Sequence, residues 1–262
     1  MNYWIGKEER AKKAIEHTDK VSKEYYLDIR NCITNSKVYG EIDKLPEKPE
    51  VTRGFPQMIF FNGTSQDAIF KYTQDDDNVA VLNFASYKFP GGGFTKGSSA
   101  QEEMLCHNSF LYNVLKAHKD YYEWNNNHKN RALYLDRAIY TPKVKFFKDK
   151  DITEVGVITC ASPNLGTAKK YQNVTDEENY KVLKSRIQFI IDIAEENNIS
   201  TLISGAFGCG VFKQNPNVVA ELFTKLLQNT CINRVIMAVP GSDENARVFE
   251  QYVKAFPYLP QL

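Results

Sequence analysis

Residues 78–103 read NVAVLNFASYKFPGGGFTKGSSAQEE and contain the pattern that decides the fold. An apolar run at residues 79–84 ends in turn residues, which is typical of a buried parallel strand that leads into a loop. Glycine lets a backbone adopt positive φ and approach a ligand closely, and three consecutive glycines follow this run: Gly91, Gly92 and Gly93. After a seven-residue spacer, an amide and two acids begin a predicted helix over residues 100–116: Gln101, Glu102 and Glu103. This order predicts a strand, a ligand-binding loop and an acid-bearing helix.

Strands and helices alternate from residue 57 onward. Strands are predicted at residues 58–61, 79–84, 155–162, 200–207 and 235–240. Helices are predicted at residues 65–74, 100–116, 177–197, 216–228 and 243–255. Alternation of this kind predicts an α/β protein whose helices cover a largely parallel central sheet. Because ligands bind beyond the carboxyl ends of the strands in such sheets, we expect the site at that edge.

The first part of the chain has a different pattern. Residues 7–36 are charged and carry apolar residues at helical spacing, whereas residues 40–56 hold three prolines. We therefore expect an N-terminal helical extension and linker at residues 1–56 and one main domain at residues 57–262. We expect the polar stretch WNNNHKNR, residues 124–131, to be a surface insertion.

Composition argues against several classes of function. The 33 lysines and arginines balance 32 aspartates and glutamates, so the chain has no overall basic field and we expect no direct DNA binding. Without an apolar run of about 18 residues or a signal-type N-terminus, we expect a soluble, cytoplasmic protein with no membrane partner. Five cysteines without a CxxC pair argue against a disulfide framework, and four histidines lack a metal-ligand spacing. We therefore expect neither a metal nor another cofactor.

A second glycine-rich block, SGAFGCGVFKQNP at residues 204–216, follows a predicted strand and precedes a predicted helix. Backbone N–H groups in such a loop can bind a diphosphate, and an ordinary strand-to-helix turn is the alternative. The block lacks the G-x-G-x-x-G order and the G-x-x-x-x-G-K-[ST] motif, which disfavours dinucleotide oxidoreductases and nucleoside triphosphatases. Cys209 lies in this block without a histidine nearby in sequence, so we do not expect a nucleophilic thiol.

Together the two blocks resemble the signature of the poly(ADP-ribose) glycohydrolases, in which GGG is followed after a short spacer by QEE and a later GCG loop carries a phenylalanine. The flanking segments LNFASYKFPGGG and EEMLCHNSFLY are similar to the microbial branch of that family, and the resemblance covers about residues 57–256. It implies a macrodomain fold, which is a three-layer α/β sandwich around a mixed, largely parallel sheet.

The resemblance also implies roles for individual residues. Glu103 would be the general acid that protonates the departing oxygen of a ribose–ribose bond and then accepts a proton from water. Glu102 would bind ribose hydroxyls, Phe212 would pack on the terminal ribose, and residues 62–64 would contact adenine. Thr64 followed by Asp67 also fits an ordinary helix cap. The ligand-binding residues would come from both blocks and the strand before the first: Asn83, Gly91, Gly92, Gly93, Gln101, Gly208, Cys209, Gly210, Val211 and Phe212.

Each acid also has a simpler explanation. Ser99 and Glu102 fit the S-x-x-E capping box, in which the glutamate side chain returns to the backbone of the cap residue. Glu103 fits a solvated acid that the helix dipole favours in a first turn. Because the two acids are neighbours, we do not interpret them as an acid and a nucleophile on opposite faces of a sugar. Apolar surroundings favour a protonated carboxyl, and three phenylalanines are candidates to provide them: Phe84, Phe94 and Phe212.

The resemblance thus implies a hydrolase that cleaves poly(ADP-ribose) from its ends without a metal and releases ADP-ribose. Its partner would be poly(ADP-ribose) or an ADP-ribosylated protein. A mono-ADP-ribosyl hydrolase that uses the same pocket is one alternative. A non-catalytic ADP-ribose-binding module is another, and a carbohydrate or ester hydrolase on an unrelated α/β fold is the third.

Overall fold

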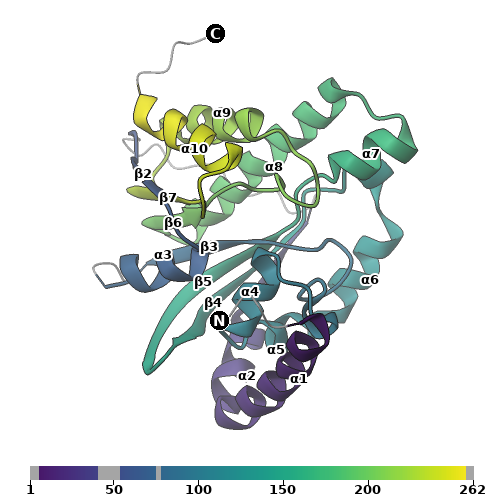
Figure 1. Cartoon of the computed structure of the whole chain (residues 1–262). Coiled ribbons are helices and arrows are strands. Elements are labelled where there is room, and N and C mark those ends of the chain that lie inside the picture. Colours follow the sequence, from purple (N-terminus) through teal and green to yellow (C-terminus); the bar gives the residue numbers. More distant parts are fainter. Residues whose placement is uncertain (1–5, 41–53, 75–77, 258–262) are drawn as a thin grey trace.

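The structure, a computed structural model, describes residues 6–40, 54–74 and 78–257. Within these ranges, seven strands form one sheet in the order β1-β4-β5-β3-β6-β7-β2. Strands β2 to β7 are labelled in Figure 1. The strands are β1 (Lys37–Tyr39), β2 (Gln57–Phe61), β3 (Val79–Phe84), β4 (Ala138–Lys148), β5 (Asp151–Cys160), β6 (Thr201–Ser204) and β7 (Arg234–Ala238). The pairs β1–β4 and β4–β5 are antiparallel, and the others are parallel. The mixed, largely parallel sheet that the sequence predicted is therefore confirmed.

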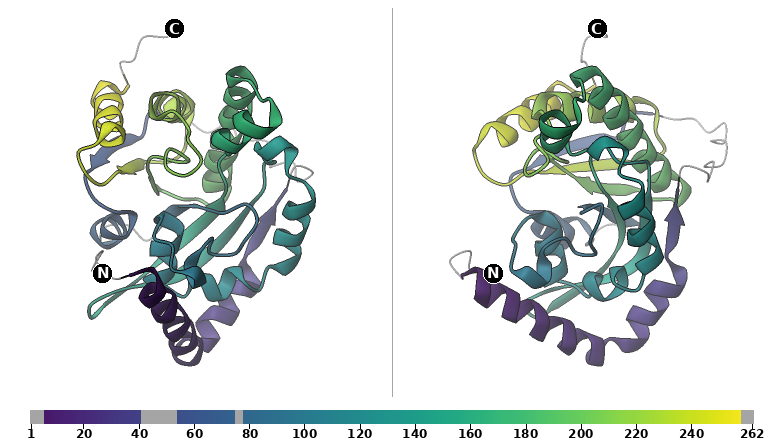
Figure 2. Two further views of the ribbon diagram at one scale, coloured as in Figure 1. Left: turned by 45° about the vertical axis from the view of Figure 1, so that its right-hand side comes forward. Right: turned by 90° about the vertical axis from the view of Figure 1, so that its right-hand side faces the viewer.

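Helices cover both faces of this sheet (Figure 2). They are α1 (Lys7–Glu24), α2 (Tyr26–Asn35), α3 (Ser65–Tyr72), α4 (Gln101–His107), α5 (Leu111–Leu115), α6 (Lys119–Asn127), α7 (Leu165–Gln172), α8 (Asp176–Glu196), α9 (Pro216–Leu226) and α10 (Glu244–Ala255), with short 3₁₀ turns η1 (Phe94–Lys96), η2 (Asn130–Ala132) and η3 (Leu227–Asn229). Leu82 of β3 packs in one core with α8, α9 and α10, whereas Val81 packs in the other core with α1 to α5. Because successive strand residues face opposite sides, the sheet separates two hydrophobic cores, and the three-layer sandwich is confirmed.

The predicted elements are found near their expected positions, with two corrections. The helix expected at residues 100–116 is wrong as a single element, because it is interrupted after His107. Ser109 Oγ donates to the Leu105 carbonyl and accepts from the Leu111 N–H, so α5 begins anew at Leu111. The strand expected at residues 200–207 ends at Ser204, where the second glycine block begins. The sequence did not predict β1, β4, α6 or α7.

The expected surface insertion at residues 124–131 holds only in part, because residues 127–131 are exposed whereas residues 124–126 before them are not. Its first residues complete α6, and the Asn125 side chain is fully buried. The Asn125 amide donates to the Tyr87 carbonyl at 2.9 Å, and its oxygen accepts from Arg137 Nε at 3.0 Å. Asn126 donates to the Lys88 carbonyl at 3.0 Å. This segment therefore supports the loop that precedes the three glycines.

The N-terminal helices pack against the rest of the molecule. The predicted helix is interrupted at Tyr25 into α1 and α2, and β1 joins the sheet beside β4. Arg10 of α1 donates from Nε to the Gly97 carbonyl at 2.8 Å. A Cβ on Gly97 would lie 1.9 Å from the Lys7 carbonyl oxygen, so the backbones of α1 and the first glycine block are in direct contact. Residues 41–53 of the predicted linker lie outside the described ranges.

Candidate active site

Two adjoining cavities lie at the carboxyl edge of the parallel strands β3 and β6. One, of about 300 Å³, is lined by the second glycine block together with Phe84 and Ser162. The other, of about 190 Å³, extends from Thr64 at the start of α3 to Pro240 after β7. Gln101 lines both cavities, so they meet at the first turn of α4. This is the edge at which the sequence predicted a ligand site.

Glu102, in the first turn of α4, is buried beneath the loop that precedes the glycines, with an exposed fraction of 3%. Its Oε2 accepts from the Ser86 N–H at 2.7 Å, and its Oε1 accepts from the Asn83 amide at 3.4 Å. The capping-box alternative is wrong, because Ala100 is the N-cap and no side chain caps this helix. Burial raises the pKa of Glu102 to about 8; the Ser86 N–H opposes this shift, and the charge of Glu103 adds to it.

Glu103 is held by the glycine loop itself. Its Oε1 accepts from the Gly93 N–H at 2.8 Å, whereas its Oε2 is buried and has no hydrogen-bond partner in the described ranges. The alternative of a solvated first-turn acid is wrong, because Glu103 is only 6% exposed. Gly92 has a φ of +58°, and a Cβ there would lie 2.6 Å from Glu103 Oε1 and 2.8 Å from Glu102 Oε2. The two carboxyls therefore converge on one point of the Gly92 backbone.

Gln101 and Asn83 hold this carboxyl pair in place. Gln101 Oε1 accepts from the Phe84 N–H at 2.8 Å, and its amide donates to the Leu82 carbonyl at 2.8 Å, which ties α4 to the end of β3. Asn83 is fully buried, and its amide lies 3.3 Å from Thr159 Oγ1 as well as next to Glu102. Contacts of either side chain with a ligand remain predictions.

The second glycine block forms a compact loop between β6 and α9. Gly208 has a φ of +78°, and a Cβ there would lie 2.2 Å from Ser162 Oγ, so only glycine fits. The Gln214 N–H donates to the Gly208 carbonyl at 3.1 Å, and the Gln214 amide donates to the Pro163 carbonyl at 2.8 Å. Gly210 and Val211 are exposed, and both line the larger cavity. The loop is thus fixed from inside and open toward the cavity.

The structure gives no support to a nucleophilic role for Cys209. Burial raises the pKa of its thiol to about 12, so the thiol stays protonated at neutral pH. Its Sγ lies 3.9 Å from the Phe207 carbonyl oxygen. A nucleophilic cysteine instead needs a lowered pKa or an adjacent base.

Two of the three predicted phenylalanines line the larger cavity, namely Phe84 and Phe212. Phe94 does not line it, because its ring is fully buried in the core below the glycine loop. There its centroid lies 4.6 Å from that of His107 and 5.0 Å from that of Tyr112. Burial lowers the pKa of His107 to about 4, so His107 packs as a neutral ring.

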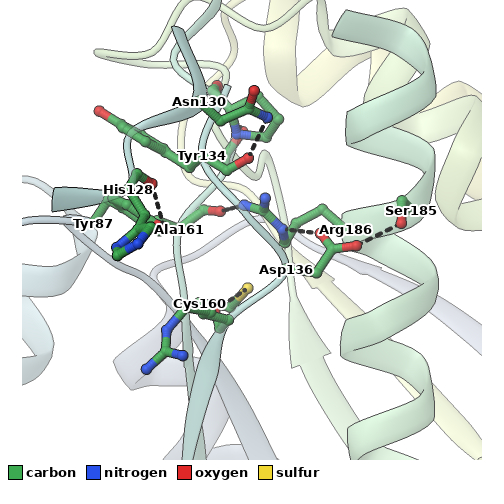
Figure 3. Close-up of polar contacts among 12 residues, drawn as sticks. Tyr87, His128, Asn130, Tyr134, Asp136, Cys160, Ala161, Ser185 and Arg186 are labelled. Carbon is green, nitrogen blue, oxygen red and sulfur yellow. Dashed lines mark hydrogen bonds and ion pairs between the residues drawn. The ribbon is translucent and has the colours of Figure 1, made fainter. Parts of the chain in front are cut away.

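Phe212 rests on an aromatic cluster that the sequence did not predict. Tyr87 and Tyr134 are stacked with ring centroids 4.2 Å apart, and Phe212 packs edge-on against Tyr134 at 6.1 Å. Tyr87 also donates from its hydroxyl to the His128 carbonyl at 3.0 Å (Figure 3). These contacts fix the orientation of a ring that faces the cavity.

A buried arginine supports the same region from α8. Arg186 is fully buried, donates to the Ala161 carbonyl and pairs through Nε with Asp136 Oδ1 at 2.5 Å (Figure 3). Ala161 immediately follows β5 and precedes Ser162, which lines the larger cavity. No motif marks Arg186; the one signal in the sequence is a charged residue among the apolar positions of a long amphipathic helix.

The smaller cavity begins at Thr64, which the sequence predicted both as an adenine contact and as a helix cap. The cap is present: Thr64 Oγ1 accepts from the Asp67 N–H at 3.1 Å, and Asp67 accepts from the Thr64 N–H at 3.4 Å. Thr64 also lines the cavity, together with Ala238 and Val239. Asn62 Oδ1 accepts from the Gly241 N–H at 3.0 Å and so connects the two loops at this end.

Two negative findings apply to the described ranges. They contain no group of three or more histidine, cysteine, aspartate or glutamate side chains arranged to hold a metal ion. None of their helices is both long enough and apolar enough to cross a membrane.

These features define the class of protein: a macrodomain-like α/β sandwich with a two-part cavity and a buried carboxyl pair at the carboxyl edge of its sheet. The chain belongs to the family of microbial-type poly(ADP-ribose) glycohydrolase (PARG) catalytic domains, whose family model matches residues 9–149. The predicted family is therefore confirmed, whereas the roles of individual site residues stay predictions.

Solved structures of bacterial PARGs are similar to this chain over nearly its whole length. The PARG of Thermomonospora curvata has 26% sequence identity and a TM-score of 0.84, with 95% of this chain and 100% of that chain covered. The same enzyme bound to the inhibitor ADP-HPD has 28% identity and a TM-score of 0.82 over 95% and 100% of the two chains. The PARG of Deinococcus radiodurans in complex with ADP-ribose has 28% identity and a TM-score of 0.79, over 87% of this chain and 97% of that one. The comparison with curated proteins gives no match.

Proposed function

We propose that this protein hydrolyses the ribose–ribose O-glycosidic bonds of poly(ADP-ribose) and releases ADP-ribose, with Glu103 as the general acid and base. The observation that carries the proposal is the carboxyl pair beneath Gly92, in a chain that belongs to the PARG family. Both oxygens of Glu102 are near N–H donors, whereas Glu103 Oε2 is buried without a partner in the described ranges. Glu103 is therefore the acid that can turn to a reacting atom.

The proposed reaction breaks the bond between C1 of the distal ribose and the 2′-oxygen of the next unit. Burial raises the pKa of Glu102 to about 8, so a proton is held on this carboxyl at neutral pH, beside Glu103. Glu103 gives a proton to the departing 2′-oxygen as the ribose develops oxocarbenium character, and then takes a proton from the water that attacks C1. Glu102 binds the hydroxyls of that ribose and fixes it above the acid.

The two cavities have the chemistry that an ADP-ribose unit requires. We place the diphosphate on the N–H groups of Gly208 and of residues 210–212, because this loop opens to the larger cavity; the Cys209 N–H already donates to the Ala206 carbonyl at 3.1 Å. The distal ribose then lies against Phe212 and the glycine loop, and the adenine occupies the smaller cavity beside Thr64. The partners would be poly(ADP-ribose) or an ADP-ribosylated protein, with ADP-ribose as the product ligand. All five cysteines are free, which supports a cytoplasmic setting.

We further propose that cleavage proceeds from chain ends, since no overall basic field grips the interior of a long anion. Time-resolved chromatography of products from long, labelled polymer tests this directly. The proposal predicts that free ADP-ribose appears from the first time point while the polymer shortens gradually. Early release of free oligomers would show internal cuts, and fast release of ADP-ribose from singly modified protein would favour a mono-ADP-ribosyl hydrolase.

A further inference from the structure

An exposed aromatic ring with two cations beside it lies on the loop that leads into the three glycines. Phe89 is 53% exposed, although phenylalanine is among the residue types most often fully buried. The Nζ atoms of Lys88 and Lys96 lie 5.9 Å and 5.7 Å from its ring centroid. Neither ammonium forms an ion pair with a carboxylate in the part of the chain that the structure describes. An apolar surface with unneutralised positive charge is thus presented to solvent.

The loop that carries Phe89 is bonded directly to the carboxyl pair. The Ser86 N–H donates to Glu102, and Ser86 Oγ accepts from the N–H groups of Lys88 at 3.3 Å and Phe89 at 3.2 Å. The Phe89 carbonyl accepts from the Gly92 N–H at 3.1 Å, and Gly92 adjoins both carboxyls. The backbone that carries the ring is therefore fixed relative to the acids, which suits a binding surface next to a reacting group.

The leaving group of a ribose–ribose bond has matching chemistry. Its 2′-oxygen belongs to an adenosine, so an adenine base and a diphosphate depart together with it. Bases stack on exposed aromatic rings, and lysine ammonium groups bind phosphate oxygens. The cavities described above hold the ADP-ribose unit that is released, and they leave the departing unit without an assigned site.

We propose that Phe89, Lys88 and Lys96 form a subsite for the adenosine diphosphate portion of the departing unit. The ring stacks on its adenine, and the two ammonium groups contact its diphosphate. This inference rests on the proposed function, because it assigns the polymer side of the same scissile bond. It also gives a physical basis for preferring polymer over a single protein-linked unit, which has no second adenosine to bind.

Binding measurements separate this subsite from catalysis. The ligands are ADP-ribose and an ADP-ribose dimer, and the background is Glu103→Gln, with dimer integrity checked by chromatography. We expect Glu103→Gln to bind the dimer more tightly than ADP-ribose. Adding Phe89→Ala should reduce the affinity for the dimer about 5- to 150-fold, since stacking of one base is worth about 1–3 kcal/mol. The affinity for ADP-ribose should stay within about twofold of that of Glu103→Gln alone. Adding Lys88→Gln and Lys96→Gln should weaken the salt dependence of dimer binding.

A matched control comes from α2, where exposed Tyr26 has Arg30 beside its ring at 5.8 Å. Tyr26→Ala should leave the affinities for both ligands unchanged. Equal affinity of the parent for the dimer and for ADP-ribose would overturn the subsite, as would an unchanged dimer affinity after Phe89→Ala. An equal loss for both ligands would also overturn it, because it would show that the ring only shapes the loop. Failure of the proposed function is a separate result, namely that the unmodified protein releases no ADP-ribose from polymer.

Discussion

Substitution of Gly92 by alanine tests whether the glycine loop sets the position of the carboxyl pair. The new Cβ would lie 2.6 Å from Glu103 Oε1, whereas ordinary contacts begin at 3.4 Å, so the carboxyl must retreat by about 0.8 Å. A misplacement of about 1 Å can cost roughly 10²-fold in rate. The φ of +58° adds about 1–2 kcal/mol of backbone strain for a residue with a Cβ. We expect kcat to fall about 10²-fold and the melting temperature to fall by about 2–8 °C.

Gly241→Ala is the matched control, because Gly241 has a φ of +99° and no atom within 4 Å of the place that a new Cβ would occupy. It should therefore show similar strain in a thermal melt and little loss of kcat. The assay is steady-state release of ADP-ribose from polymer, together with melting curves for both variants. If Gly92→Ala kept more than about a tenth of the kcat of the parent, the carboxyls would not be held where the structure places them, and the reasoning would be refuted.

Three further predictions concern the contact of helix α1 with Gly97, the pKa of Glu102 and the thiol of Cys209. Gly97→Ala should destabilise the protein by about 3–5 kcal/mol, because left-handed strain adds to a clash with the Lys7 carbonyl, and relief of that clash moves the Gly97 carbonyl away from Arg10. Gly6→Ala, which meets no neighbour, is the control, and equal melting curves for the two variants would contradict the contact. Because burial raises the pKa of Glu102 to about 8 in the folded state, stability from this group is full below its unfolded pKa of about 4.5 and is lost as the pH rises through about 8. The melting temperature of Glu102→Gln should therefore rise relative to that of the parent as the pH increases from about 5 to about 9. A difference in melting temperature that does not change with pH would refute the raised pKa. Cys209→Ser should turn over polymer at the rate of the parent, because the pKa of the thiol is about 12 and the thiol is not a nucleophile. The rate should also be unchanged in excess chelator. A more than about tenfold fall in rate would indicate thiol chemistry in the first case and metal chemistry in the second.

The sequence predicted those parts of the fold whose signals are local. The apolar run at residues 79–84 became β3 with the expected bounds, and the two glycine blocks lie at the carboxyl ends of neighbouring parallel strands. Both blocks need glycine for reasons that the structure makes concrete, because Gly92 and Gly208 have positive φ and no room for a Cβ. Strand alternation and turn chemistry are properties of a short window, so such elements can be predicted without tertiary information.

The elements that the sequence missed depend on contacts between distant segments. Asn125 looked like part of a polar insertion, yet it is buried because its amide completes the hydrogen bonds of Tyr87 and Arg137. The capping box at Ser99 matched its motif, and Glu102 nevertheless turned inward to the Ser86 N–H. Local propensity is overridden when burial with a specific partner is available, and no pattern in the sequence reveals that partner.

The Glu103→Gln variant tests the central claim most directly, because it removes the acid while keeping the size of the side chain. The measurement pairs kcat on poly(ADP-ribose) with the affinity for ADP-ribose, so that the loss of the acid is separated from the loss of the site. General acid catalysis is typically worth about 10²- to 10⁴-fold, and the acid acts on the transition state more than on the bound ligand. We predict a fall in kcat of at least about 10²-fold with ADP-ribose affinity within a few fold of the parent. Retention of more than about a tenth of kcat would contradict the assignment of Glu103 as the general acid.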